Sequence, residues 1–188
     1  MSEDLANQLI EAGSAETFLR TRSEATDWRI VASLKTEVDR LVACDLNQAE
    51  RLADRVCALA SVIGDPLSGA FADAIRARVL DNLGRYSESD GLYERAAVVM
   101  RGARLTREAA IVQKQQITPL VHLGLYGPAL QKARGARRVL ARTEPLHYAQ
   151  LEANIGNIYY RLDQYGSALA HYERARDLVA SSGDEAML

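Results

Sequence analysis

Apolar residues in the last third of the chain recur at helical spacing. Two short stripes lie on either side of Asp163, each with three members in which neighbours are three or four positions apart. They are Ile155, Tyr159 and Leu162, and Ala168, Tyr172 and Ala175. Positions three and four apart share one face of an α-helix, so the pattern predicts two amphipathic helices joined by a short turn. The small alanines of the second stripe favour close approach of the two helices.

The same pattern occurs at a fixed interval along the chain. The segments LGRYSESDGLYERAAVV, LGLYGPALQKARGARRVL and LDQYGSALAHYERARDLV align, and their tyrosines Tyr86, Tyr126 and Tyr165 stand 40 and 39 residues apart. One further step back reaches Leu46, within the fainter copy ACDLNQAERLADRVCALA. A constant period of this length indicates repeated helix pairs, because each pair buries its apolar face only by stacking on the next.

Each copy predicts a first helix before the turn and a second helix after it. The first helices are expected at about 28–43, 67–83, 107–123 and 146–162, and second helices at positions such as 87–100 and 166–180. Gly84 and Gly124 follow their first helices directly, where glycine readily takes the left-handed conformation that ends a helix. Asp163 occupies the same column in the last copy and is a weaker choice for that conformation.

These spacings predict an all-α, right-handed α-solenoid of about four helix hairpins. We expect an N-terminal helical cap at 1–27 and four repeats within 28–183, at about 28–66, 67–106, 107–145 and 146–183. The tail 184–188 has the composition of the start of a further repeat.

The fourth copy, EANIGNIYYRLDQYGSALAHYERARDLV, resembles a tetratricopeptide repeat (TPR). The small and large residues of that motif are matched by Ile155, Gly156, Tyr159, Tyr165, Ala168, Tyr172 and Ala175. The common TPR is 34 residues long, and longer second helices would accommodate the difference. A HEAT-like array has a period closer to this one but does not account for the Leu-Gly-x-Tyr turns. The resemblance implies a scaffold that binds another protein or a peptide on its concave surface.

The opening of the chain also resembles a narrower family. LANQLIEAG and KTEVDRLVACDLNQAERLADRVCALASVIGDP are similar to the start of bacterial TPR proteins that carry a C-terminal CHAT domain, a caspase-like protease module. This resemblance implies an alternative function, the recognition or regulatory region of such a protease, whose His/Cys pair has no counterpart in this sequence.

Composition and charge narrow the function classes. The 188 residues carry 23 basic and 25 acidic side chains, a balance that disfavours a dedicated nucleic-acid or membrane-surface protein. No phosphate-binding loop, dinucleotide fingerprint or metal-ligand cluster occurs, so we expect no enzyme activity, cofactor or metal. With no secretory start and with two cysteines, Cys44 and Cys57, that form no disulfide framework, a cytoplasmic location is expected.

The concave surface of a TPR array is lined by the first helices, so the tyrosine columns predict which residues line a groove. The candidates for partner binding are Arg78, Asn82, Lys114, Thr118, His122, Asn157, Tyr160 and Arg161. Cations beside amides suit an acidic or extended peptide, because charge-assisted hydrogen bonds join them. The alternative is a helix face that is merely solvated. The corresponding first-repeat residues Leu34, Val38 and Val42 are apolar, and we expect the N-terminal helices to cover them.

Three other features carry expectations. The basic residues Lys132, Arg134, Arg137, Arg138 and Arg142 occur with no acid between Leu125 and Thr143, and helical spacing places them on an outward, solvated face. Pro119 lies inside a predicted first helix, where it is expected to cause a kink. Self-association through the last repeat is a further possibility, with Leu178 and Val179 as candidates for the contact.

Overall fold

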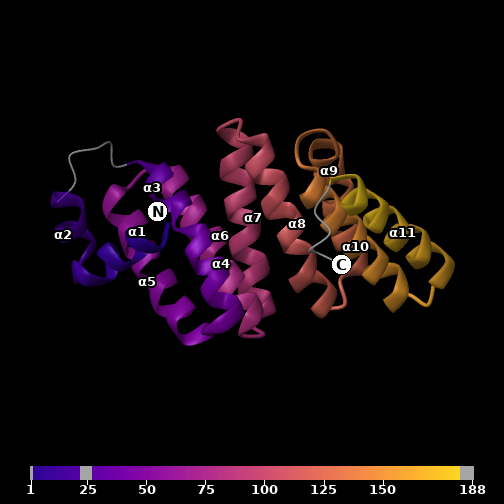
Figure 1. Cartoon of the computed structure of the whole chain (residues 1–188), viewed down its shortest axis with the longest axis horizontal. Helices are drawn as coiled ribbons and strands as arrows, with labels where there is room; N and C mark the ends of the chain where they lie inside the picture. Colours follow the sequence, from indigo (N-terminus) through magenta and orange to yellow (C-terminus); the bar gives the residue numbers. More distant parts are fainter. Residues whose placement is uncertain (1, 22–26, 183–188) are drawn as a thin grey trace. The chain divides into compact units, whose positions relative to one another are not determined.

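The computed structural model describes residues 2–21 and 27–182, and all regular structure within these ranges is α-helical (Figure 1). The helices are α1 (Ser2–Glu11), α2 (Ala15–Arg20), α3 (Trp28–Ser33), α4 (Lys35–Cys44), α5 (Leu46–Ile63), α6 (Pro66–Asn82), α7 (Tyr86–Gly102), α8 (Thr106–His122), α9 (Tyr126–Thr143), α10 (Pro145–Arg161) and α11 (Tyr165–Ser182). Contacts divide the chain after Ala103 into two units, described separately below. The predicted tail 184–188 and positions 22–26 of the predicted cap lie outside the described residues.

The first unit contains α1 to α7, in which α5 packs on α4 and α6, and α6 packs on α7. The first helix expected at 28–43 is divided at Leu34, whose N–H bonds the carbonyl of Val31, three residues back, at 3.2 Å. The side chain of Leu34 is fully buried, so the division goes with the burial of this residue in the core. Val38 is also buried and Val42 is half-buried, as expected of residues that neighbouring helices cover.

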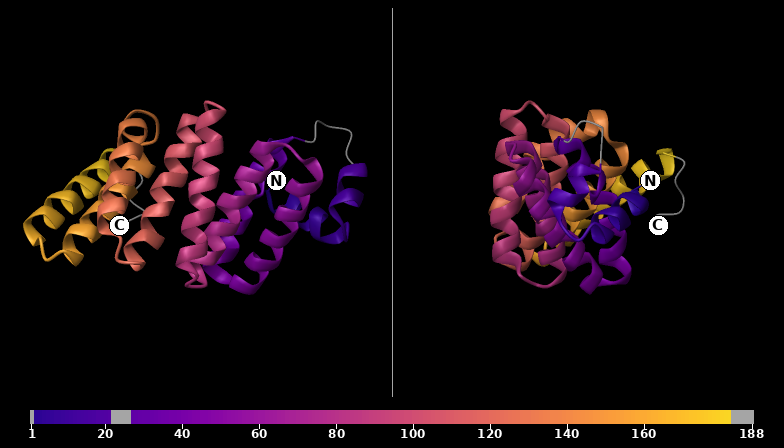
Figure 2. Two further views of the ribbon diagram at one scale, coloured as in Figure 1. Left: turned by 180° about the vertical axis from the view of Figure 1, so that it is seen from behind. Right: turned by 90° about the vertical axis from the view of Figure 1, so that its left-hand side faces the viewer.

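The second unit contains two helix hairpins, α8–α9 and α10–α11, with α10 packed against α8, α9 and α11 (Figure 2). Its core forms where the inward residues of α9 meet those of α8 and α10. The core members are Ala110, Ile117, Leu120, Ala129, Ala133, Ala136, Leu140, Leu151, Ile155 and Ile158. Four of the α9 residues, Ala129, Ala133, Ala136 and Leu140, are fully or almost fully buried and form the inward side of this helix. The alanines among them let the helices pack closely.

The turns that end the first helices have the predicted backbone conformation. Gly84 and Gly124 both have a φ of 73°, and Asp163 has a φ of 57°. After each of them the next N–H bonds a carbonyl five residues back, as in Leu125 to Leu120 at 2.8 Å and Gln164 to Tyr159 at 2.9 Å. This pairing satisfies the carbonyls that the end of a helix leaves without partners. The period seen in the sequence is therefore a repeat of one hairpin geometry.

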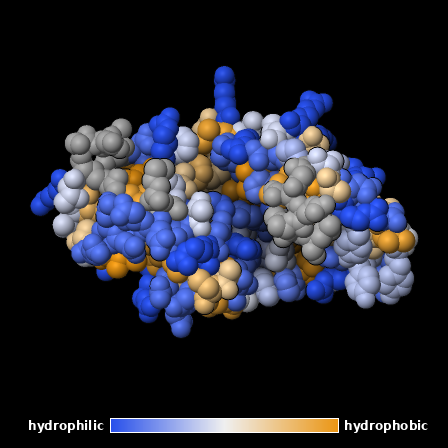
Figure 3. Space-filling view, viewed as in Figure 1, coloured by the Kyte–Doolittle hydropathy of each residue, from blue (hydrophilic) through white to orange (hydrophobic). Residues whose placement is uncertain are grey.

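The second unit contains the residues expected to mediate self-association and the proline expected to kink a helix. Leu178 is half-buried and Val179 is 8% exposed, so these two side chains offer little apolar surface, and self-association through the last repeat stays a prediction. The most exposed apolar side chains of this unit lie near the α10–α11 turn, where Tyr165 and Leu169 are 58% and 57% exposed. In the space-filling view of Figure 3, hydrophilic colours predominate and smaller hydrophobic patches lie between them. The kink at Pro119 stays a prediction; the residue is buried within α8, and Leu123 donates a hydrogen bond to its carbonyl at 2.9 Å.

Candidate functional site

The second unit has a surface groove of about 480 Å³ between α8 and α10, the first helices of the third and fourth repeats. Each helix contributes four residues to it. The lining residues are Ile117, Thr118, Val121, His122, Asn154, Asn157, Tyr160 and Arg161. Five of the eight predicted partner-binding residues therefore meet around one groove. This placement follows from helical geometry, because the residues lie one turn apart on equivalent faces of two packed helices.

The groove has an apolar base and a polar rim. Ile117 is 1% exposed and also belongs to the core, and Val121 packs against that core. His122 and Arg161 are exposed near the ends of α8 and α10. No carboxylate is among the lining residues, and within the described part of the chain no acidic group forms an ion pair with Arg161. The arrangement presents donors to an incoming ligand and little that would repel a negative charge.

Asn157 is oriented by a neighbouring tyrosine. The hydroxyl of Tyr172 donates a hydrogen bond to Asn157 Oδ1 at 2.8 Å. Because this bond occupies the amide oxygen, the Nδ2 group, with two protons, is the part of the amide left to donate to a ligand. Tyr172 reaches this position because residue 156 is a glycine: a Cβ there would stand 2.6 Å from the tyrosine ring. Gly156 thus supports the groove indirectly.

Tyr160 forms an aromatic side of the groove and is 59% exposed. Its ring makes an edge-to-face contact with Tyr165, with centroids 5.5 Å apart. The Tyr165 hydroxyl donates to Asp163 Oδ1 at 2.7 Å, and this bond raises the pKa of Tyr165. The second ring is therefore held in place by the turn, and it supports the first from behind.

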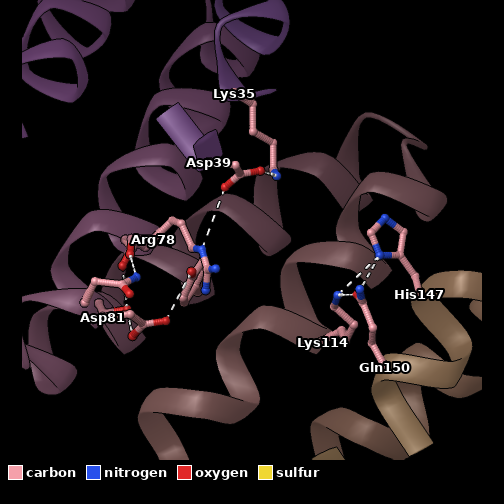
Figure 4. A network of polar contacts seen from close by, with 11 residues as sticks. Lys35, Asp39, Arg78, Asp81, Lys114, His147 and Gln150 are labelled. Atoms are coloured by element: carbon pink, nitrogen blue, oxygen red, sulfur yellow. Dashed lines mark hydrogen bonds and ion pairs between the residues drawn. The ribbon is translucent and has the colours of Figure 1, made fainter. Parts of the chain in front are cut away.

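Lys114 was predicted for the groove but does not line it. The side chain is 8% exposed, and its Nζ donates to Gln150 Oε1 at 2.5 Å and lies 3.2 Å from His147 Nδ1 (Figure 4). Lys114 is on the expected face of α8, one turn before Thr118. The two α10 residues cover it, and spacing within α8 alone does not reveal a cover supplied by another helix.

Arg78 and Asn82 belong to the first unit. Arg78 Nε lies 3.7 Å from Asp39 Oδ1, and Asn82 Nδ2 donates to the Arg78 carbonyl at 2.9 Å (Figure 4). Asp39 also pairs with Lys35, so the α4 and α6 residues form one polar group in this unit. The role of Arg78 and Asn82 in partner binding stays a prediction.

A buried carboxylate in α10 was missed at the level of the sequence. Glu152 is fully buried, and its Oε2 accepts hydrogen bonds from His171 Nδ1 at 2.8 Å and Arg174 Nη1 at 3.0 Å. Arg137 Nε lies 3.0 Å from Oε1, so this arginine is paired and differs from the solvated residue expected on α9. Burial acts to raise the pKa of Glu152, but the bonds from His171 and Arg174 and the Arg137 charge outweigh it and lower the pKa below its usual value.

The sequence did contain a signal for this cluster. Glu152 and Arg174 are 22 residues apart, and Asp73 and Arg95 form an ion pair at the same spacing in the second repeat. The third repeat has Gly135 where the other two have arginine. The cluster ties α9, α10 and α11 together, so its role in this structure is to fix the helices that carry the groove.

Within the residues that the structure describes, no three potential ligand side chains gather as a metal site. None of the helices in that same part combines the length and the apolar character needed to cross a bilayer.

The all-helical fold of the described residues is shared by solved structures of TPR-like helical repeat proteins. BtubC (BKLC) from P. vanneervenii is similar over 95% of this chain and 92% of its own, with 17% identity and a TM-score of 0.53. MamA of AMB-1 is similar over 95% of this chain and 97% of its own, with 14% identity and a TM-score of 0.55. A double mutant of MamA from RS-1 has 16% identity over 96% of this chain and 94% of its own, with a TM-score of 0.55. At these identities the likeness shows the fold alone. No protein-family model and no curated protein sequence matches the chain.

Proposed function

We propose that this protein is an interaction scaffold that binds an extended, acidic segment of a partner protein in the groove between α8 and α10. The observation that carries the proposal is the lining itself, in which eight residues from two helices surround about 480 Å³ and none of them is acidic. Donor groups on a structured scaffold select for acceptors, and a carboxylate is the strongest acceptor that a peptide offers.

Three groups have distinct roles in this proposal. Arg161 pairs with a ligand carboxylate, and Asn157 donates its Nδ2 protons to a ligand backbone carbonyl or to the same carboxylate. Tyr160 supplies an exposed ring against which an apolar ligand side chain packs, as aromatic residues often do at interfaces. The apolar base at Ile117 and Val121 accommodates the same side chain.

Helix packing prepares the groove before any ligand arrives. Asn157 is already oriented by Tyr172, and Tyr160 is supported by Tyr165. Groups that are already ordered lose less conformational entropy on binding, which favours affinity for a flexible peptide. A segment of a partner that is itself unstructured would supply such a peptide.

The test is a peptide-display selection against the whole chain, followed by affinity measurements on the selected peptides. The groove variant is Asn157→Ala with Arg161→Ala. The matched control is Asn47→Ala with Arg51→Ala, an exposed asparagine and arginine at the same spacing on α5. We expect acidic peptides whose affinity falls about 10- to 100-fold in the groove variant, the equivalent of losing one or two charged hydrogen bonds. The control should bind as the wild type does. Selected peptides without acidic residues, or equal loss in both variants, would contradict the proposal.

A second function rests on the sequence of α1, α4 and α5. The likeness of LANQLIEAG and of the following KTEVDR segment to CHAT-domain TPR proteins supports a regulatory role, in which partner binding controls a caspase-like protease. Reading the gene beyond position 188 tests it. A downstream His/Cys pair within one reading frame supports this role, and its absence removes it.

A further inference from the structure

The outward face of α9 carries a row of arginines that the groove does not use. Arg134, Arg138 and Arg142 are spaced four residues apart and all three are exposed. Four residues advance a helix by about 6 Å, so the guanidinium groups start from a line of Cα positions about 12 Å long. The inward residues Ala133, Ala136 and Leu140 alternate with them. The row therefore lies on the side of α9 turned away from the core.

Ten arginines of the described residues are paired with carboxylates. Within residues 2–21 and 27–182 the arginines in ion pairs are Arg29, Arg40, Arg76, Arg78, Arg85, Arg95, Arg107, Arg137, Arg174 and Arg176. Across the same ranges no carboxylate pairs with the three arginines of the row, and α9 itself contains no acidic residue. The chain as a whole has a net charge of −2, whereas this face of α9 carries three positive charges with no acidic residue to neutralise them.

The row is particular to α9 rather than a property of the repeat. The positions of α11 that correspond to Arg134 and Arg138 hold Glu173 and Asp177, and the corresponding position of α7 holds Glu94. The repeat geometry alone does not require a basic residue at these columns. The second helices α7 and α11 have acidic residues at the Arg134 column, so solvent exposure alone does not explain an arginine there.

We infer that the Arg134–Arg138–Arg142 row is a second docking surface, and that its occupant is an acidic helix of a partner protein. An α-helix with carboxylates four residues apart matches the spacing of the arginines, and guanidinium groups bind carboxylates through two parallel hydrogen bonds. Nucleic acid fits less well, because the outward face of α9 has no aromatic residue for base stacking and three cations neutralise few phosphates. This surface is separate from the groove, so the scaffold would hold two acidic elements at once.

The experiment measures the binding of a labelled, alanine-based helical peptide with glutamate at every fourth position, at a low salt concentration of about 50 mM. The row variant is Arg134→Gln, Arg138→Gln and Arg142→Gln. The control changes three exposed arginines elsewhere, Arg20→Gln, Arg51→Gln and Arg101→Gln, and so alters the net charge equally.

The wild type is expected to bind this peptide, and the affinity should fall at least 10-fold in the row variant but less than 3-fold in the control. The same peptide with glutamine in place of glutamate should not bind. The Asn157→Ala, Arg161→Ala groove variant should keep its affinity for this peptide, so failure of the groove proposal and failure of this one are distinguishable. Equal affinities of wild type and row variant, equal losses in row variant and control, or tighter binding of a 20-base-pair duplex through the same arginines would each overturn the inference.

Discussion

We predict that the carboxyl of Asp81 in the first unit makes a contribution to stability that falls as pH rises. The carboxyl is 7% exposed, and burial raises its pKa from 3.8 to about 6, against hydrogen bonds from Ser89 and Tyr93 that act to lower it. Ser89 Oγ lies 2.6 Å from Asp81 Oδ1 and 3.0 Å from the carbonyl of Ala77. A hydroxyl has one proton for these two acceptors. Protonation of Asp81 removes the conflict, because the carboxyl then donates to Ser89 and Ser89 donates to Ala77.

The sign and size of the effect follow from the two pKa values. Between pH 3.8 and about 6 the folded protein holds a proton on Asp81 that the unfolded chain has lost, so the free energy of unfolding decreases as pH rises through this window. The difference of just over two pKa units corresponds to about 3 kcal/mol once the pH exceeds 6. Asp81→Asn keeps the shape, lets Nδ2 donate to Ser89 and removes the charge. The variant is therefore expected to be more stable than wild type by up to about 3 kcal/mol at pH 8, with a gap that shrinks toward zero at pH 4.

Urea unfolding followed by tryptophan fluorescence measures this directly. The chain has one tryptophan, and Trp28 stacks on Phe71 of α6 with ring centroids 5.0 Å apart, so its emission reports the unit that contains Asp81. Asp54→Asn, at an exposed ion pair, is the control and should change stability by less than about 1 kcal/mol. A gap between wild type and Asp81→Asn that is constant from pH 4 to pH 8, or that widens toward acid, would refute the reasoning.

Three further predictions concern the second unit and are checked by thermal unfolding. Gly156→Ala places a Cβ 2.6 Å from an aromatic ring and should cost about 1–3 kcal/mol, whereas Gly166→Ala, in open space, should be neutral; equal melting temperatures would show that the ring moves freely. Glu152→Gln removes the buried carboxylate that accepts from His171 and from Arg174, whose side chain is 45% exposed, and should cost about 2 kcal/mol at pH 7, against less than about 1 for Asp73→Asn at the more exposed pair. Because the pKa of Glu152 is lowered, this contribution should disappear as the pH falls below 4.5, and a persistent difference there would contradict it. Pro119→Ala should restore a backbone hydrogen bond and raise the melting temperature, and an unchanged or lower value would count against a kinked α8.

Helix positions and turns were predictable because they depend on local sequence. The left-handed turns at Gly84, Gly124 and Asp163 follow from residues adjacent in the chain, and the hairpin helices begin and end within a few residues of the positions expected. The division of the 28–43 helix at Leu34 was not predicted, because no glycine, proline or other helix-ending residue marks it in the sequence.

The lining residues of the groove were predictable where the face of a single helix decides their position. Thr118 and Asn157 occupy corresponding columns, and the structure places both in the lining. Lys114 meets the same spacing rule yet is buried, because His147 and Gln150 reach it from a different helix. Helical periodicity predicts the face of the helix on which a side chain lies, but it does not predict which side chains of a neighbouring repeat will bury it.

The most direct test of ligand binding between α8 and α10 is an NMR titration of the ¹⁵N-labelled chain, in which amide proton–nitrogen signals are followed as an acidic peptide from the display selection is added. The side-chain amide signals of Asn154 and Asn157 should shift with the backbone signals of Thr118 and His122, and the signals of α1 to α5 should stay in place. Shifts confined to other helices, with those two amides unchanged, would contradict a ligand held between α8 and α10.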